Sequence, residues 1–190
     1  MPSSSEVPEL RVVDVIAQRL ARETRFAFGV PGGEVLSLID AIRLAGTRFV
    51  LARHESSAGF MAEGALRSDR WTLGRGDTPG RGDTLGVLVA TLGPGVANTV
   101  NVVSRAKQSR QPLVVLTGCV AAADAGTYTH QVFDHVSVLR PLVKASFVVA
   151  ADTVGEVVER AIALAQEGVP GVVHIEVPVD VADQRVRPEH

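Results

Sequence analysis

Apolar residues recur at helical spacing in several segments, and short apolar, β-branched runs lie between them. Leu10, Val13, Ala17 and Leu20 follow the three- and four-residue period of an amphipathic helix. The same period predicts helices over 34–45, from Glu55 onward, over 94–107 and over 154–165, and the short runs predict strands at 25–30, 48–51, 87–91, 113–117, 144–149 and 172–177. Six strands that alternate with helices indicate a three-layer α/β fold, with a six-stranded parallel sheet covered by helices on both faces.

Length and composition favour a single domain. The chain has 190 residues, of which 46% are apolar, enough for one sizeable core and too few for two typical enzyme domains. We expect a polar tail over 1–8, one domain over 9–182 and a second tail over 183–190. Within the domain, 68–86 break the periodicity with a tandem Gly-Arg-Gly-Asp-Thr repeat, which predicts an inserted, mobile surface loop.

The charge balance argues against several classes of partner. Nineteen basic and twenty-one acidic residues give a net charge of −2, so nucleic acid and anionic membranes are not expected partners. The sequence contains no secretory leader pattern and no run of roughly 18 apolar residues, which predicts a soluble, cytoplasmic protein. The single cysteine, Cys119, excludes an internal disulfide and a thiolate cluster, and the five histidines lack ligand spacing, so no metal site is expected on this chain.

Candidate binding groups follow the predicted strands. In a parallel sheet, the carboxyl ends of the strands form the edge at which ligands bind. At this edge we expect Pro31-Gly32-Gly33, Glu55, Gly93-Pro94-Gly95 with Asn98, Gly118-Cys119, and the loop that holds His130 and Gln131. Taken singly, Glu55 is explained by the favourable position of an acid at a helix start, and each glycine by a simple turn. Three such turns and an acid at one edge favour a binding site.

One of these turns is close to a dinucleotide-binding fingerprint. Gly93-Pro94-Gly95-Val96-Ala97-Asn98 follows a strand and opens a helix, but Asn98 occupies the place of the third small residue. The following strand ends at Leu116-Thr117-Gly118-Cys119 without the acid that would bind a ribose. A nucleotide-binding domain is therefore the less favoured alternative.

Taken in order, these segments resemble the N-terminal, pyrimidine-binding domain of thiamine-diphosphate-dependent enzymes, in particular the acetolactate-synthase-like group. The resemblance covers nearly the whole chain, and its fold is the one predicted above. It rests on the segments Phe28-Gly29-Val30-Pro31-Gly32-Gly33, Arg53-His54-Glu55, 90–98, 112–118, Arg140-Pro141-Leu142-Val143-Lys144 and Val177-Pro178-Val179-Asp180.

The resemblance implies a catalytic role for Glu55. This carboxylate would hydrogen-bond atom N1′ of the cofactor's aminopyrimidine ring and so promote formation of the thiazolium ylid. We expect Ala58, Phe60 and Met61 to shield Glu55 and to raise its pKa, which suits proton exchange with a ring nitrogen.

The resemblance also implies roles for the neighbouring turns. Pro31 and Gly32 would approach the pyrimidine, whereas Gly93, Pro94, Gly95 and Asn98 would shape the cofactor site and a subunit contact. Tight backbone packing explains these glycines equally well.

On the substrate side, the resemblance implies Cys119, His130 and Gln131. Cys119 replaces a Gln, and His130 replaces a Phe common in acetolactate synthases, which argues against that activity itself; 90–95 and 129–131 are similar to carboxyethylarginine-synthase relatives. No His or Lys adjoins Cys119 in the sequence, so we interpret it as a packed side chain rather than a nucleophile.

The resemblance implies a second, diphosphate-binding half. In this family Mg²⁺ and the diphosphate are held by a domain that carries a Gly-Asp-Gly motif, which the sequence lacks; Gly76-Asp77-Thr78 and Gly82-Asp83-Thr84 lack its last glycine. We therefore expect a split subunit or an excised domain that pairs with a diphosphate-binding partner in a hetero-oligomer. The implied reaction is decarboxylation of a 2-oxo acid or carboligation. The alternative is a non-catalytic regulatory module with the same fold.

Overall fold

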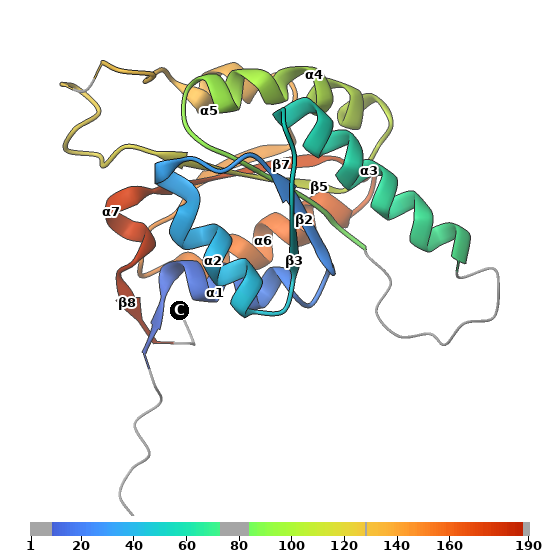
Figure 1. Ribbon diagram of the computed structural model, residues 1–190, viewed down its shortest axis with the longest axis horizontal. Helices are drawn as coiled ribbons and strands as arrows, with labels where there is room; N and C mark the ends of the chain where they lie inside the picture. The colour runs from blue at the N-terminus through green and yellow to red at the C-terminus, as the bar shows by residue number, and fades with distance from the viewer. Residues whose placement is uncertain (1–8, 73–83, 128, 188–190) are drawn as a thin grey trace, which may run out of the picture.

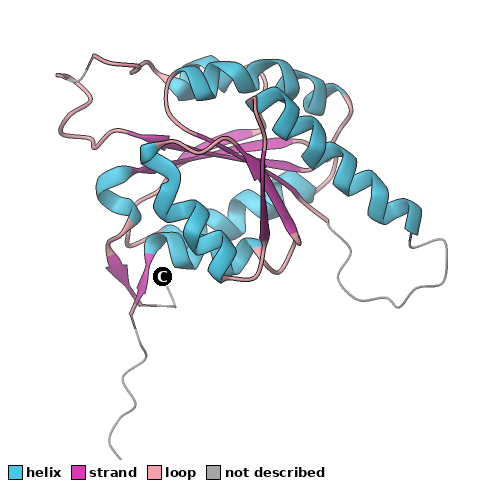
Figure 2. Ribbon diagram, viewed as in Figure 1, coloured by secondary structure: helices cyan, strands magenta, loops and turns pink. Residues whose placement is uncertain are grey.

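A parallel sheet of six strands forms the centre of the protein (Figures 1 and 2). The computed structural model describes residues 9–72, 84–127 and 129–187. The strands are β2 (Phe26–Gly29), β3 (Arg48–Leu51), β4 (Gly86–Ala90), β5 (Leu113–Cys119), β6 (Ala145–Val148) and β7 (Val172–Pro178). Their order across the sheet is β3-β2-β4-β5-β7-β6, and each neighbouring pair is parallel.

Two layers of helices cover the sheet, which confirms the predicted three-layer α/β fold (Figure 1). On one face lie α1 (Val12–Leu20), α2 (Leu36–Leu44) and α6 (Val154–Gln166); on the other lie α3 (Glu55–Thr72), α4 (Pro94–Gln108) and α5 (His135–Leu139). A 3₁₀ turn, η1 (Gly33–Val35), precedes α2, and α7 (Val179–Ala182) follows β7. The apolar stripes read from the sequence are the buried faces of these helices. Each buried Val, Leu or Ile side chain stabilises the fold by roughly 1.5–3 kcal/mol.

The central strands are buried on both sides, as their continuous apolar sequences predict. In β5, residues 113–118 are all buried, and β4 and β7 flank this strand. The polar side chain of His174 on β7 also lies within this core with no exposed surface. Its Nε2 is 2.8 Å from Thr117 Oγ1 and its Nδ1 is 3.2 Å from Ser146 Oγ, so both ring nitrogens have partners.

The structure differs from the sequence-based expectation at three boundaries. A small antiparallel pair joins β1 (Leu10–Arg11) to β8 (Arg185–Val186), so α1 begins at Val12 and the expected tail over 183–190 contains a strand. Helix α3 continues to Thr72, into the segment expected to be the loop 68–86. Two-residue strands carry no detectable periodicity, and polar surface positions do not mark a helix end.

The remaining expectations at the ends and in the loop fall outside the described residues. These are residues 1–8, 188–190 and 73–83, the last of which include most of the Gly-Arg-Gly-Asp-Thr repeat. Within the described part of the chain, no helix combines the length and apolarity that crossing a membrane requires.

Candidate functional site

The candidate site lies where neighbouring strands lead to opposite faces of the sheet. After β2 the chain enters η1 and α2 on one face, whereas after the adjacent β4 it enters α4 on the other. Such a switch point opens a crevice at the carboxyl ends of the strands. The loops approach closely there: a Cβ on Gly32 would lie 2.4 Å from Thr91 Oγ1, and one on Gly95 would lie 2.9 Å from Thr91 Cγ2. Thr91 therefore contacts both predicted glycine turns.

Glu55 is the first residue of α3, and 5% of its surface is exposed. Its Oε2 accepts a hydrogen bond from Asn98 Nδ2 at 2.9 Å, and the neighbouring Ser56 Oγ donates to the carbonyl oxygen of Asn98 at 2.7 Å. A Cβ on Gly95 would lie 3.5 Å from Glu55 Oε1. Among the described residues, Oε1 accepts no hydrogen bond. The site thus contains a buried carboxylate with one oxygen held and the other available to an outside donor.

The burial of Glu55 has a different origin from the one expected. Phe60 and Met61 are 44% and 40% exposed, so the expectation that they shield the carboxylate is wrong. Gly59 lies at the contact between α3 and α4. A Cβ on Gly59 would lie 2.5 Å from Val102 Cγ1, which shows that the backbone of α3 packs directly against the Val102 side chain of α4. This close approach brings the first turn of α4 over Glu55.

The turn before α4 has a conformation that requires glycine. Gly93 has φ +59°, in the region that other residues rarely adopt, and an added Cβ would lie 2.1 Å from the carbonyl oxygen of Gln131. Pro94 follows as the first helical residue, where its missing N–H costs nothing. The structure therefore brings Gln131 against the glycine turn. His130 and Pro31 are exposed.

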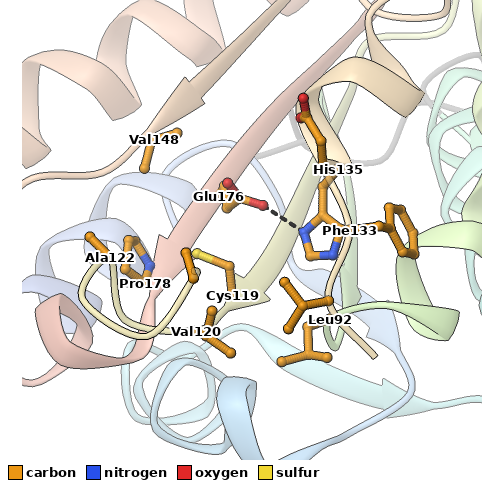
Figure 3. A pocket seen from close by; sticks show the side chains of 12 residues that line it. Leu92, Cys119, Val120, Ala122, Phe133, His135, Val148, Glu176 and Pro178 are labelled. Carbon is orange, nitrogen blue, oxygen red and sulfur yellow. Dashed lines mark hydrogen bonds and ion pairs between the residues drawn. The ribbon is translucent and has the colours of Figure 1, made fainter. Parts of the chain in front are cut away.

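Cys119 lies in a cavity of about 240 Å³ beside this turn, at the carboxyl ends of β5 and β7 (Figure 3). The walls are mainly apolar, and the polar members are Cys119, Asp134, His135 and Glu176. Burial, together with the charges of Glu176 and Asp180, raises the pKa of the Cys119 thiol to about 12. The thiol is therefore protonated at neutral pH, which supports its interpretation as a packed side chain.

The sequence alone did not point to four residues that the structure places at this edge, namely Thr91, Glu34, His135 and Glu176. Thr91 Oγ1 donates to Glu34 Oε2 at 2.5 Å. His135 Nε2 accepts from the Gly93 backbone N–H at 3.0 Å, and its Nδ1 is 2.6 Å from Glu176 Oε1. Glu34 could have been found, because it directly follows the Pro-Gly-Gly turn. Nothing in the sequence connects His135 with Glu176, which is 41 residues away.

Comparison with known proteins decides the family. The family model described as "Thiamine pyrophosphate enzyme, N-terminal TPP binding domain" matches residues 10–138. The chain belongs to this family. As a TPP-binding domain it implies thiamine diphosphate as the cofactor, and the resemblance inferred from the sequence is confirmed.

Several curated proteins are similar to this TPP-binding domain. The isozyme 3 large subunit of acetolactate synthase from Escherichia coli K12 is 34% identical over 169 residues, which cover 88% of this chain and 27% of that protein. The catabolic acetolactate synthase of Raoultella terrigena is 32% identical over 170 residues (89% and 28%), and the 2-hydroxyacyl-CoA lyase 2 of Danio rerio is 35% identical over 159 residues (82% and 23%). The chain thus spans about a quarter of the length of these relatives.

The residues of the TPP-binding domain fit the pyrimidine part of the cofactor. Glu55 Oε1 is a shielded acceptor with no hydrogen bond from the described residues, as a protonated ring nitrogen would require, and Gly95 places no side chain beside this oxygen. The described ranges contain no cluster of three His, Cys, Asp or Glu side chains arranged for a metal ion.

Proposed function

We propose that this domain forms the pyrimidine side of a thiamine-diphosphate site and that Glu55 exchanges a proton with atom N1′ of the cofactor. The observation that carries the proposal is the state of the Glu55 carboxylate, which is 5% exposed, with Oε2 bound by Asn98 and Oε1 without a donor among the described residues. A carboxylate held in this way has one oxygen at which a proton can be accepted and returned.

The neighbouring residues prepare this oxygen for its task. Asn98 binds Oε2 and so determines which oxygen faces the ligand, and Ser56 fixes the backbone of Asn98. Because Gly32 and Gly95 carry no side chain, both turns pack directly against Thr91. When bound, thiamine diphosphate supplies the nucleophilic carbon and the electron sink for decarboxylation or carboligation of a 2-oxo acid.

The proposal includes a partner. A second chain with the Gly-Asp-Gly motif would hold the diphosphate and Mg²⁺, in a cytoplasmic hetero-oligomer in which the first turns of α3 and α4 face that chain. The greater length of the relatives supports a further domain at the site. Pro31, Gly93 and Pro94 would complete the cofactor side, and Cys119, His130 and Gln131 would face the 2-oxo acid.

The test is an acid-to-amide substitution in the reconstituted complex. The product of an adjacent reading frame with the Gly-Asp-Gly motif is co-expressed with this chain, and 2-oxo-acid turnover is measured. We expect Glu55→Gln and Glu55→Ala to lower kcat by at least ~100-fold, because a positioned proton-transfer group contributes on the order of 10²–10⁴.

The matched control makes the same chemical change elsewhere on α3. Glu63 is also buried, and its carboxylate pairs with Arg67 at 2.6 Å. A Gln there can still accept from Arg67, so Glu63→Gln is expected to keep its activity. Full activity of Glu55→Gln would refute the catalytic role of Glu55. Turnover by the partner without this chain would favour the non-catalytic alternative.

A further inference from the structure

His135 is a buried residue that the proposed chemistry does not use. It opens α5, 5% of its surface is exposed, and the ring of Phe133 packs edge-on against it with ring centroids 4.9 Å apart. Figure 3 shows its imidazole between Glu176 and the turn that carries Leu92. Its two ring nitrogens contact Gly93, which follows β4, and Glu176 on β7. Packing alone does not explain a buried histidine with two such polar partners.

The contacts of His135 determine its tautomer. A backbone N–H can only donate, so the bond from Gly93 at 3.0 Å requires a bare Nε2. The ring proton is then on Nδ1, which donates to Glu176 Oε1 at 2.6 Å. The carboxylate thus selects the tautomer that can receive Gly93, in the same way that a neighbouring acid fixes a metal-bound or catalytic histidine.

The hydrogen bond from Gly93 to His135 is connected to Glu55 through the start of α4. Gly93 is the residue before α4, and its left-handed conformation persists only if the surroundings hold it. Asn98, near the start of α4, donates to the Glu55 carboxylate, and Gly95 in the same segment lies beside it. A movement of the Gly93 turn would therefore move the donor to Oε2.

We propose that His135, fixed by Glu176, is a positioning residue that holds the Gly93 turn and, through it, the start of α4 against Glu55. Its significance for turnover rests on the proposed function of Glu55. The contacts of His135 with Gly93 and Glu176 lie within this chain, so they can be tested without a partner or cofactor.

The test uses nuclear magnetic resonance on the full chain, without partner or cofactor. Histidine nitrogen shifts give the tautomer, hydrogen exchange reports the Gly93 amide, and the side-chain amide signals of Asn98 report its bond to Glu55. In the wild type we expect His135 to carry its proton on Nδ1. In His135→Leu we expect the Gly93 amide to exchange about tenfold faster and the Asn98 signals to shift. His135→Gln, whose Oε1 reaches the place of Nε2, should restore both.

The control is Val148→Ala, at the exposed rim of the same cavity, which should change neither signal. A proton on Nε2, or a folded His135→Leu with wild-type Gly93 and Asn98 signals, would overturn the proposal. If His135→Leu does not fold, the decision falls to His135→Gln, where unprotected Gly93 overturns the proposal and protected Gly93 supports it. Because these readouts need no turnover, failure of the catalytic role of Glu55 would leave the result on His135 intact.

Discussion

Asn98 donates a hydrogen bond to Glu55 at 2.9 Å, while its own carbonyl oxygen accepts one from Ser56 at 2.7 Å. The donor and acceptor are 43 residues apart and belong to the first turns of two different helices. Since each helix donates once to the other, the two turns are fixed as one unit. The orientation of the carboxylate is therefore set before any ligand arrives.

The Glu55 carboxylate is expected to cost folding stability. A buried carboxyl group that one neutral hydrogen bond holds is poorly compensated for its lost hydration, and Gln has nearly the same shape. We predict that Glu55→Gln raises the free energy of unfolding of the isolated chain at pH 7 by on the order of 1 kcal/mol, measured by urea denaturation. Glu63→Gln, which weakens the pair with Arg67, should lower it. A loss of stability in Glu55→Gln would contradict this account.

Gly59 is expected to be indispensable at the contact between α3 and α4. Alanine is normally better than glycine inside a helix by up to about 1 kcal/mol, but here its Cβ would lie 2.5 Å from Val102 Cγ1. We predict that overpacking dominates and that Gly59→Ala lowers the free energy of unfolding by about 1–3 kcal/mol.

Gly64, in the same helix, is the matched control. An added Cβ there meets nothing within 4 Å, so Gly64→Ala should stabilise the chain by roughly 0.5–1 kcal/mol. Equal effects of the two substitutions in thermal or urea unfolding would refute the close-contact interpretation.

His174 predicts a loss of stability in mild acid. Burial lowers its pKa from 6.5 to about 4 in the folded chain, so the unfolded chain binds the proton more tightly. Above about pH 6.5, His174 is neutral in both states and does not lower the free energy of unfolding. As the pH falls from there toward 4, the free energy of unfolding decreases by on the order of 3 kcal/mol in total. Urea unfolding at several pH values measures this slope. In His174→Gln the slope over this range should be shallower, and an unchanged slope would contradict the prediction.

Cys119 predicts slow thiol chemistry in the native chain. With the pKa of its thiol raised to about 12, the thiolate fraction at pH 8 is roughly a thousandfold lower than in the unfolded chain. Alkylation by iodoacetamide should therefore be slower in buffer than in urea by roughly that factor. Because Cys119 is the single cysteine, the measured rate belongs to it alone. Comparable rates in the two solutions would show that the native thiol is as reactive as an unperturbed one and would contradict the prediction.

Local signals predicted much of the fold. The run at 48–51 became β3 without a change of boundary, and Glu55 is the first residue of α3, because the apolar run ends just before the polar Arg53-His54-Glu55 segment. Thiamine diphosphate was predicted from the family resemblance, because the spacing of apolar residues gives no information about a cofactor. The shielding by Phe60 and Met61 was predicted wrongly, since sequence proximity does not tell which helix face a neighbour will cover.

Long-range contacts could not be predicted. His135 meets Glu176 because β7 lies beside β5 in the sheet, and the order of strands is not written in any local pattern. The pairing of Leu10 with Val186 has the same character, since it joins residues from opposite ends of the chain. Such contacts depend on topology, which spacing alone does not give.

Two hydrogen bonds at the start of α4 use main-chain atoms of that segment. The Gly93 amide donates to His135, and the Asn98 carbonyl accepts from Ser56. A main-chain carbonyl is the same whatever side chain its residue carries, so the bond from Ser56 does not depend on the Asn98 side chain. Gly93, by contrast, must remain glycine because of its positive φ. Mutational libraries that reshape the ligand pocket can therefore vary exposed positions of α4 other than Pro94 and Asn98, because the Asn98 side chain also donates to Glu55. Ser56 and His135 should be left unchanged in such designs.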